Sequence, residues 1–155
     1  MWRGVSFSIG ASALVIVLVG AAAASARITV NRGVAAIGLG MTAAEVRARL
    51  GKPSLDAVSG ATRNYVYRRR ALVVSLVRSR VVIVSTRSPR ERTAGGIGVG
   101  STDADVRRRV RGARCAATAD VQFCRVGSIR PGRRSTTFQI QQGRVVTVTV
   151  ARGLT

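Results

Sequence analysis

The side chains that could do chemistry are few in this sequence of 155 residues. It has no histidine and six carboxylates, and Lys52 is its only lysine. Nucleophilic catalysis needs a base beside a nucleophile, and the closest pairing on offer is Ser54 with Lys52, beside a glycine and a proline. Because no ligand set or acid–base pair stands out, we expect no catalytic residue, no metal site and no cofactor. An enzyme is kept as a rival interpretation.

A glycine-rich run, GGIGVGST from Gly95 to Thr102, comes close to the frame of a nucleotide-binding P-loop. In that motif a lysine reaches the terminal phosphates, but Ser101 stands in its place here. The matched run from Gly38 to Thr42 also lacks the lysine. Both runs precede predicted helices, so we interpret them as turns and not as phosphate-binding loops.

Basic side chains dominate the charge of the chain, which is formally +20. Such a charge attracts anionic surfaces and polymers, although it also fits a solvated surface produced by compositional bias. Nucleic acid is a poor candidate partner, because the sequence has few aromatic residues on which bases could stack. The candidate polyanion-binding residues are Arg68, Arg69, Arg70, Arg107, Arg108, Arg111, Arg130, Arg133 and Arg134.

The first 26 residues have the layout of a secretory signal peptide. Arg3 precedes an apolar run from Ile9 to Ala24, and the small residues Ala24-Ser25-Ala26 follow as a cleavage site. The alternative is an uncleaved membrane anchor, since the run approaches the length that spans a bilayer. We therefore predict an exported protein, either secreted or held in the periplasm or cell envelope.

Cys115 and Cys124 are the only cysteines. An even pair in an exported chain is expected to be oxidised. A metal or redox site is the weaker alternative, because the spacing is not C-x-x-C and no histidine completes a ligand set.

The chain contains an internal match that predicts two helices. Residues 37–50 read IGLGMTAAEVRARL and residues 97–110 read IGVGSTDADVRRRV. Thr42 with Glu45, and Thr102 with Asp105, have the spacing of reciprocal helix caps. Gly51 and Pro53 are expected to end the first helix.

A second match, between residues 72–87 and 136–151 at an offset of 64, predicts strands. Apolar residues alternate with polar ones there, so one face of the sheet is expected to be buried and the other wet. The candidate partner-binding residues on the wet face are Thr137, Gln139, Gln141, Thr147 and Thr149. The predicted fold class is α+β, with two tandem repeats (27–92 and 93–155), each a short helix packed on a three-stranded antiparallel β-meander.

The pattern Gly-x-Met/Ser-Thr-x-x-Glu/Asp-Val, followed by Tyr65-x-Tyr67 and valine-rich strands, resembles the SmpA/OmlA/BamE family and the tandem repeat of beta-lactamase inhibitory protein. The resemblance covers about residues 37–152. It implies that the chain acts by binding other proteins, as members of these families do in outer-membrane assembly or on a secreted enzyme. The expected function is thus a non-catalytic binding or scaffold module of the cell envelope that contacts a protein partner through its sheet face. The alternative is an electrostatic binder of anionic envelope polymers or lipid head groups.

Overall fold

The computed structural model describes residues 27–118 and 121–154, and the predicted signal peptide lies outside them. Strands make up the largest share of the regular structure, and the two helices are short. The elements are β1 (Ile28–Thr29), β2 (Gly33–Val34), β3 (Ile37–Gly38), α1 (Ala43–Leu50), β4 (Leu55–Ser59), β5 (Thr62–Tyr67), a 3-10 turn (Arg68–Arg70), β6 (Leu72–Val77), β7 (Arg80–Thr86), α2 (Asp103–Arg109), β8 (Arg114–Ala117), β9 (Gln122–Gly127), β10 (Arg134–Gln141) and β11 (Arg144–Arg152). Within this part of the chain, neither helix is long and apolar enough to cross a membrane.

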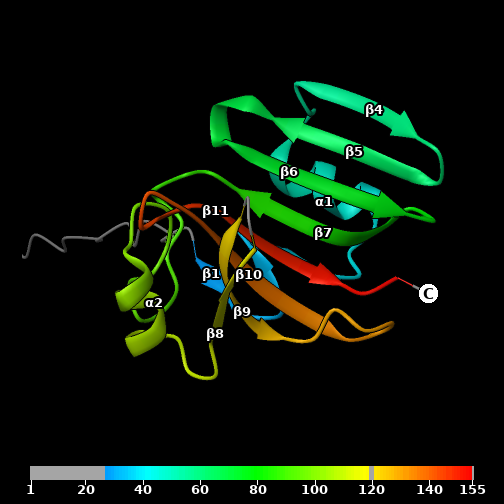
Figure 1. Ribbon diagram of the computed structural model, residues 1–155. Helices are drawn as coiled ribbons and strands as arrows, with labels where there is room; N and C mark the ends of the chain where they lie inside the picture. The colour runs from blue at the N-terminus through cyan, green and yellow to red at the C-terminus, as the bar shows by residue number, and fades with distance from the viewer. Residues whose placement is uncertain (1–26, 119–120, 155) are drawn as a thin grey trace, which may run out of the picture.

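The fold is one eight-stranded antiparallel sheet, in the order β4-β5-β6-β7-β11-β10-β9-β8, with a three-stranded sheet made of β1, β2 and β3 (Figure 1). The prediction of two tandem helix-on-meander repeats is therefore wrong. Each half of the chain supplies four strands, and β7 and β11 pair with each other to make a single sheet. This pairing has a clear physical cause, because separate meanders would leave the backbone groups of both strands without partners at an open edge. The boundary between residues 92 and 93 stays a prediction.

The two halves of the large sheet meet at an approximate twofold axis. In the pairing of β7 with β11, Val84 lies opposite Val150, Ser85 opposite Thr149, and Thr86 opposite Val148. Residues 84–86 match residues 148–150 at the offset of 64 found in the sequence. The axis consequently passes between Ser85 and Thr149, whose hydroxyl oxygens lie 2.9 Å apart.

Equivalent details recur on both sides of this axis. A register shift follows Ser75 in the β6–β7 pair and Gln139 in the β10–β11 pair, again 64 residues apart. Arg80 donates to the carbonyl of Gly40 at 3.0 Å, and Arg144 donates to that of Gly100 at 3.0 Å. Each glycine-rich run is thereby fastened to the start of the strand that reaches the axis.

One face of the large sheet is the core face, on which α1 and the small sheet pack; Figure 1 shows α1 behind β6 and β7. Val46 of α1 and Val106 of α2 are fully buried against this core. The largest fully buried side chains are Tyr65, Phe138, Ile37, Leu72, Leu76, Ile97 and Ile140. Residues between the core-facing ones point to the opposite side of the sheet, since side chains alternate along a strand. We call that side the open face.

Both helices begin at threonine caps. Thr42 accepts from the backbone N–H of Glu45 at 3.3 Å, and the Glu45 carboxylate accepts from the backbone N–H of Thr42 at 2.7 Å, which completes a capping box. In α2, Thr102 accepts from the N–H of Asp105 at 3.1 Å and donates its hydroxyl to the Asp105 carboxylate at 2.9 Å. These hydrogen bonds hold the pKa values of Glu45 and Asp105 below their usual range.

The single disulfide joins Cys115 to Cys124, which lie directly opposite each other in the β8–β9 hairpin. Cys124 is fully buried, so the bond fastens the short edge strand β8 to the core side of the sheet.

Replacing both cysteines with alanine is expected to lower the free energy of unfolding by roughly 2 to 3 kcal/mol, because closing so short a loop removes that much entropy from the unfolded chain. Urea unfolding of the variant and the oxidised protein measures the difference. Equal midpoints with equal slopes would show that the bond does not stabilise the fold.

Candidate binding face

A groove of about 580 Å³ crosses the open face where the two halves meet. Its lining comes from both halves: Val66, Tyr67, Arg68, Ala71, Leu72, Val73, Ser85 and Arg87 from the first, and Gln139, Thr147 and Thr149 from the second. The hydroxyl pair of Ser85 and Thr149 lies within this lining. The junction of β7 with β11 therefore builds the groove as well as the sheet.

All five side chains predicted to bind a partner lie on β10 or β11. Gln139, Thr147 and Thr149 line the groove. Thr137 lies opposite Thr149 on the same face and accepts from Nε of Arg125 at 3.2 Å. Gln141 is exposed at the far end of β10, next to the turn. The structure thus brings three of the five together and places the other two along the same strand.

Apart from Arg68, the groove residues that the first half supplies were not identified from the sequence. Val66, Val73, Ser85 and Arg87 line it beside the predicted residues. Val73 and Ser85 alternate with the buried Leu72, Val74 and Val84, so the same period that located the polar face of β10 and β11 was also present in β6 and β7. The valine side chains hid that signal, because they made the face look apolar.

The open face carries no negative charge within the eight described strands. Asp56 is the only carboxylate in those strands, and it lies on the core face opposite Tyr65. There it binds Nε of Arg63 at 2.7 Å and Nη2 of Arg47 at 3.2 Å, and the Arg63 hydrogen bonds are the main cause of the lowered pKa of Asp56. The groove therefore combines hydroxyl, amide and guanidinium groups with valine side chains.

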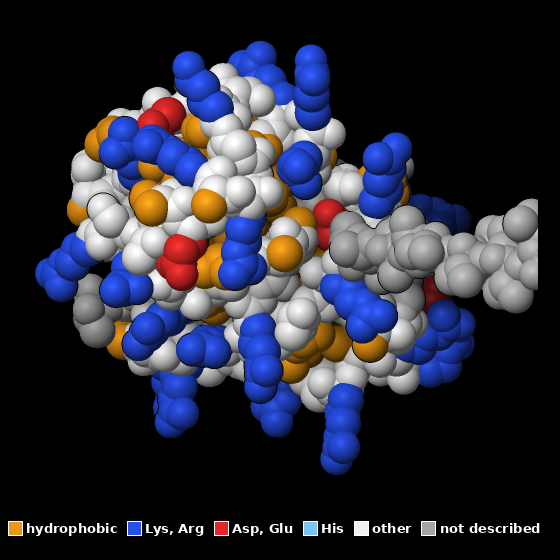
Figure 2. Space-filling view, turned by 180° about the vertical axis from the view of Figure 1, so that it is seen from behind, with side chains coloured by type: hydrophobic (Ala, Val, Ile, Leu, Met, Phe, Trp, Pro, Cys, Tyr) orange, Lys and Arg blue, Asp and Glu red, His pale blue; other side chains and the backbone are white. Residues whose placement is uncertain are grey.

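The predicted polyanion-binding arginines do not form one patch. Arg68, Arg69 and Arg70 lie in the turn between β5 and β6, while Arg130, Arg133 and Arg134 lie around the β9–β10 connection. Arg107 and Arg108 pair with Asp103 and Asp105 along α2, and Arg111 follows that helix. On the side opposite to Figure 1, Lys and Arg side chains are spread around the whole visible surface (Figure 2). Of the nine candidates, Arg68 is the one that lines the groove.

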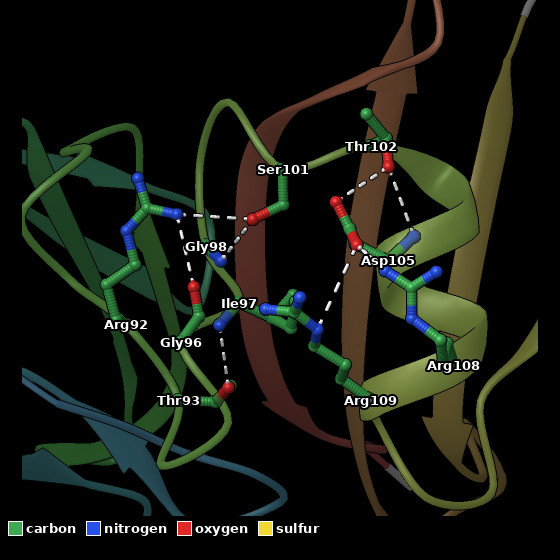
Figure 3. A network of polar contacts seen from close by, with 10 residues as sticks. All are labelled: Arg92, Thr93, Gly96, Ile97, Gly98, Ser101, Thr102, Asp105, Arg108 and Arg109. Atoms are coloured by element: carbon green, nitrogen blue, oxygen red, sulfur yellow. Dashed lines mark hydrogen bonds and ion pairs between the residues drawn. The ribbon is translucent and has the colours of Figure 1, made fainter.

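The glycine-rich loop before α2 is hydrogen-bonded to the guanidinium group of Arg92 (Figure 3). The guanidinium of Arg92 donates to the carbonyls of Pro89, Gly96 and Val99 at 3.1 to 3.2 Å, and to the hydroxyl of Ser101 at 3.2 Å. A P-loop cradles phosphate with its N–H groups, whereas this loop turns carbonyls inward, and Ser101 already accepts from the N–H of Gly98 at 3.1 Å. The loop leads into α2, and hydrogen bonds from Arg92 stabilise its conformation.

Glu91, next to Arg92, is a buried carboxylate with 7% exposure, and its Oε2 atom has no hydrogen-bond partner. Burial raises the pKa of Glu91, an effect that the positive charge of Arg70 partly offsets. Within the described residues, no group of three or more His, Cys, Asp or Glu side chains is placed to hold a metal ion.

No protein-family model matches the sequence, and no curated protein matches it. Solved structures do share part of the fold. An extracellular protein containing a SCP domain, from Bacillus anthracis, is 11% identical over 74% of this chain and 44% of its own length, with a TM-score of 0.56. A cysteine-rich secretory protein from Staphylococcus aureus is 12% identical over the same shares, with a TM-score of 0.50. This chain spans less than half the length of either protein. A DUF4309 family protein from Bacillus subtilis, 14% identical over 72% of this chain and 78% of its own length, has a TM-score of 0.44.

The resemblance to the SmpA/OmlA/BamE family and to beta-lactamase inhibitory protein is therefore wrong, since the structures that share the fold belong to other proteins. The residues that carried it explain the error. Thr42 and Glu45 cap a helix, and Gly51, with φ of 78°, ends it. Any short helix between a tight turn and a strand favours such residues, so the motif reports local structure and not family.

Glu91→Gln is expected to increase the free energy of unfolding at pH 7. A carboxyl group with a raised pKa favours the folded state most when protonated, so its stabilising contribution falls as pH rises above the ordinary value of 4.5. The gain from the substitution should shrink toward pH 4, as urea unfolding at both pH values would measure.

Glu45→Gln supplies the control of opposite sign, because the pKa of Glu45 is lowered and its contribution is present at neutral pH and lost in acid. A Glu91→Gln variant that is less stable than the parent at pH 7 would contradict this account of the buried carboxylate.

Proposed function

We propose that this protein is an exported, non-catalytic binding module of the cell envelope, and that it contacts a protein partner through the open face. The observation that carries the proposal is the groove at the β7–β11 junction, which joins polar side chains from both halves on a face opposite the packed core. Its residues Thr147, Thr149 and Val73 are half-buried, so they are held in place by the sheet yet remain accessible.

The composition of the open face suits a partner that binds reversibly. Across four strands, Val66 pairs with Val73, Val73 with Ser85, and Ser85 with Thr149, so apolar and polar side chains adjoin on this face. Non-obligate interfaces mix apolar and polar area in a similar way. Six neighbouring strands at about 4.8 Å spacing span roughly 24 Å, which is wide enough for a partner footprint of about 800 Å².

Export is supported by three observations. The Cys115–Cys124 bond belongs to oxidising compartments, and the first 26 residues have a signal-peptide layout. The two solved structures with a shared fold are an extracellular protein and a secretory protein. By analogy we place this chain outside the cytoplasm, secreted or in the envelope.

The second candidate function is electrostatic binding of anionic envelope polymers or lipid head groups. It is favoured by one observation, namely that Arg68 and Arg87 line the groove while the described strands put no carboxylate on the open face. Binding of this kind should weaken steeply with salt.

Thr147→Arg separates the two candidates, because it adds both bulk and positive charge to the groove. We expect it to reduce capture of a protein partner from envelope extract by at least about tenfold, which is the effect of losing one central contact. The reduction should be the same at about 0.1 M and at about 0.5 M salt. The matched control is Thr29→Arg, since Thr29 is exposed on β1 away from the open face.

Capture that survives Thr147→Arg but disappears at high salt would contradict the protein-partner proposal and favour the polyanion. Turnover of any substrate by the purified protein, abolished in a groove variant, would contradict the non-catalytic part.

A further inference from the structure

A second pocket lies at the corner of the open face formed by β8 and β9. Its volume is about 550 Å³, and its lining includes Arg114, Ala116, Phe123 and Arg125. Arg114 and Arg125 are directly opposite each other in the hairpin, as are Ala116 and Phe123. The two guanidinium groups therefore rise from the same face of adjacent strands into one pocket.

Arg125 is held in a defined orientation there. Its Cζ atom lies 4.7 Å from the centre of the Phe123 ring, and its Nε donates to Thr137 at 3.2 Å. Among the described residues, none accepts from its terminal nitrogens or from the guanidinium of Arg114. Within the described part of the chain those donors are open to a ligand, and the planar guanidinium group of arginine matches the geometry of phosphate oxygens.

Like charges placed directly opposite each other destabilise a strand pair. The fold holds them together all the same, because the Cys115–Cys124 bond crosses the next position of the same hairpin. The one carboxylate within the described strands, Asp56, lies in β4 at the opposite edge of the sheet and binds other arginines. The repulsion at the corner is thus not relieved from within the described sheet.

We propose that this corner is a binding site for a phosphate monoester group. Two guanidinium groups match the charge of about −1.5 to −2 that such a group carries at pH 7, whereas a single carboxylate would leave one cation uncompensated. Ala116 and Phe123 line the same pocket and give the organic part of the ligand an apolar surface. The site stands apart from the central groove, with which it shares no lining residue.

The test uses the purified protein with its disulfide intact and methyl phosphate as the probe, titrated calorimetrically at constant ionic strength. Arg114→Gln and Arg125→Gln are each expected to weaken binding by at least about tenfold, because each removes charge-assisted hydrogen bonds. Arg90→Gln is the matched control, since it makes the same charge change at an exposed position in the connection between β7 and α2. Acetate should bind more weakly than methyl phosphate.

A further arm identifies the source of the phosphate. Vesicles of phosphatidylcholine, with and without phosphatidic acid, are sedimented with the same variants. Binding that needs both phosphatidic acid and the two arginines identifies a lipid ligand. Binding to methyl phosphate but not to the vesicles identifies a soluble or polymeric ligand. The proposal is overturned if methyl phosphate does not bind, if neither arginine matters, or if Arg90→Gln weakens binding as much as they do. Because Arg114 and Arg125 lie outside the groove, this outcome is independent of the capture experiment with Thr147→Arg.

Discussion

The pairing of β7 with β11 is the interaction on which the rest of the structure depends. It covers two strand edges at once, and it turns eight strands from two halves of the chain into one sheet. Once that sheet is continuous, both short helices and the small sheet lie on its core side, and the open face extends across the axis between Ser85 and Thr149. The groove forms because strands from both halves contribute side chains to the same face.

The distribution of charge follows from the same arrangement. The described carboxylates cap helices, pair with arginines on the core side or are buried, as Glu45, Asp56 and Glu91 illustrate. Arginines on the open face are then left without anionic neighbours in the described strands. Much of the formal charge of +20 is spread around the surface, so two local arrangements, the groove and the β8–β9 corner, say more about binding than the total does.

The sequence predicted local structure well and assembly poorly. The spacing of Thr42 with Glu45 and the alternation of apolar and polar residues over 136–151 are signals within one or two elements, and each corresponds to a feature of the structure. Each half has one strand more than the predicted three-stranded meander. The sheet ends in β4, where Leu55–Ser59 is exposed and without an apolar run, and in β8, which has four residues. No local pattern says that β7 pairs with β11. The pairing joins residues 64 positions apart in the sequence, such as Ser85 and Thr149. It forms because the edge strands of both halves would otherwise have unpaired backbone N–H and C=O groups.

The candidate site shows the same division. Thr147 and Thr149 were found from alternation, while Ser85, Val73 and Arg87 joined them only through the junction. Nothing in the sequence placed Arg114 beside Arg125, since their register depends on the β8–β9 hairpin. The family resemblance failed for a related reason: helix caps are short-range features, and the order of strands in a sheet is not.

The central claim is that the open face at the junction contacts a protein partner. Its most direct test is to incorporate a photoreactive amino acid in place of Gln139, in the groove, or in place of Thr29, exposed on β1, and to irradiate cells that export the protein. The account predicts a discrete protein adduct from position 139 and none from position 29. An adduct from position 29 alone, or equal adducts from both, would contradict it.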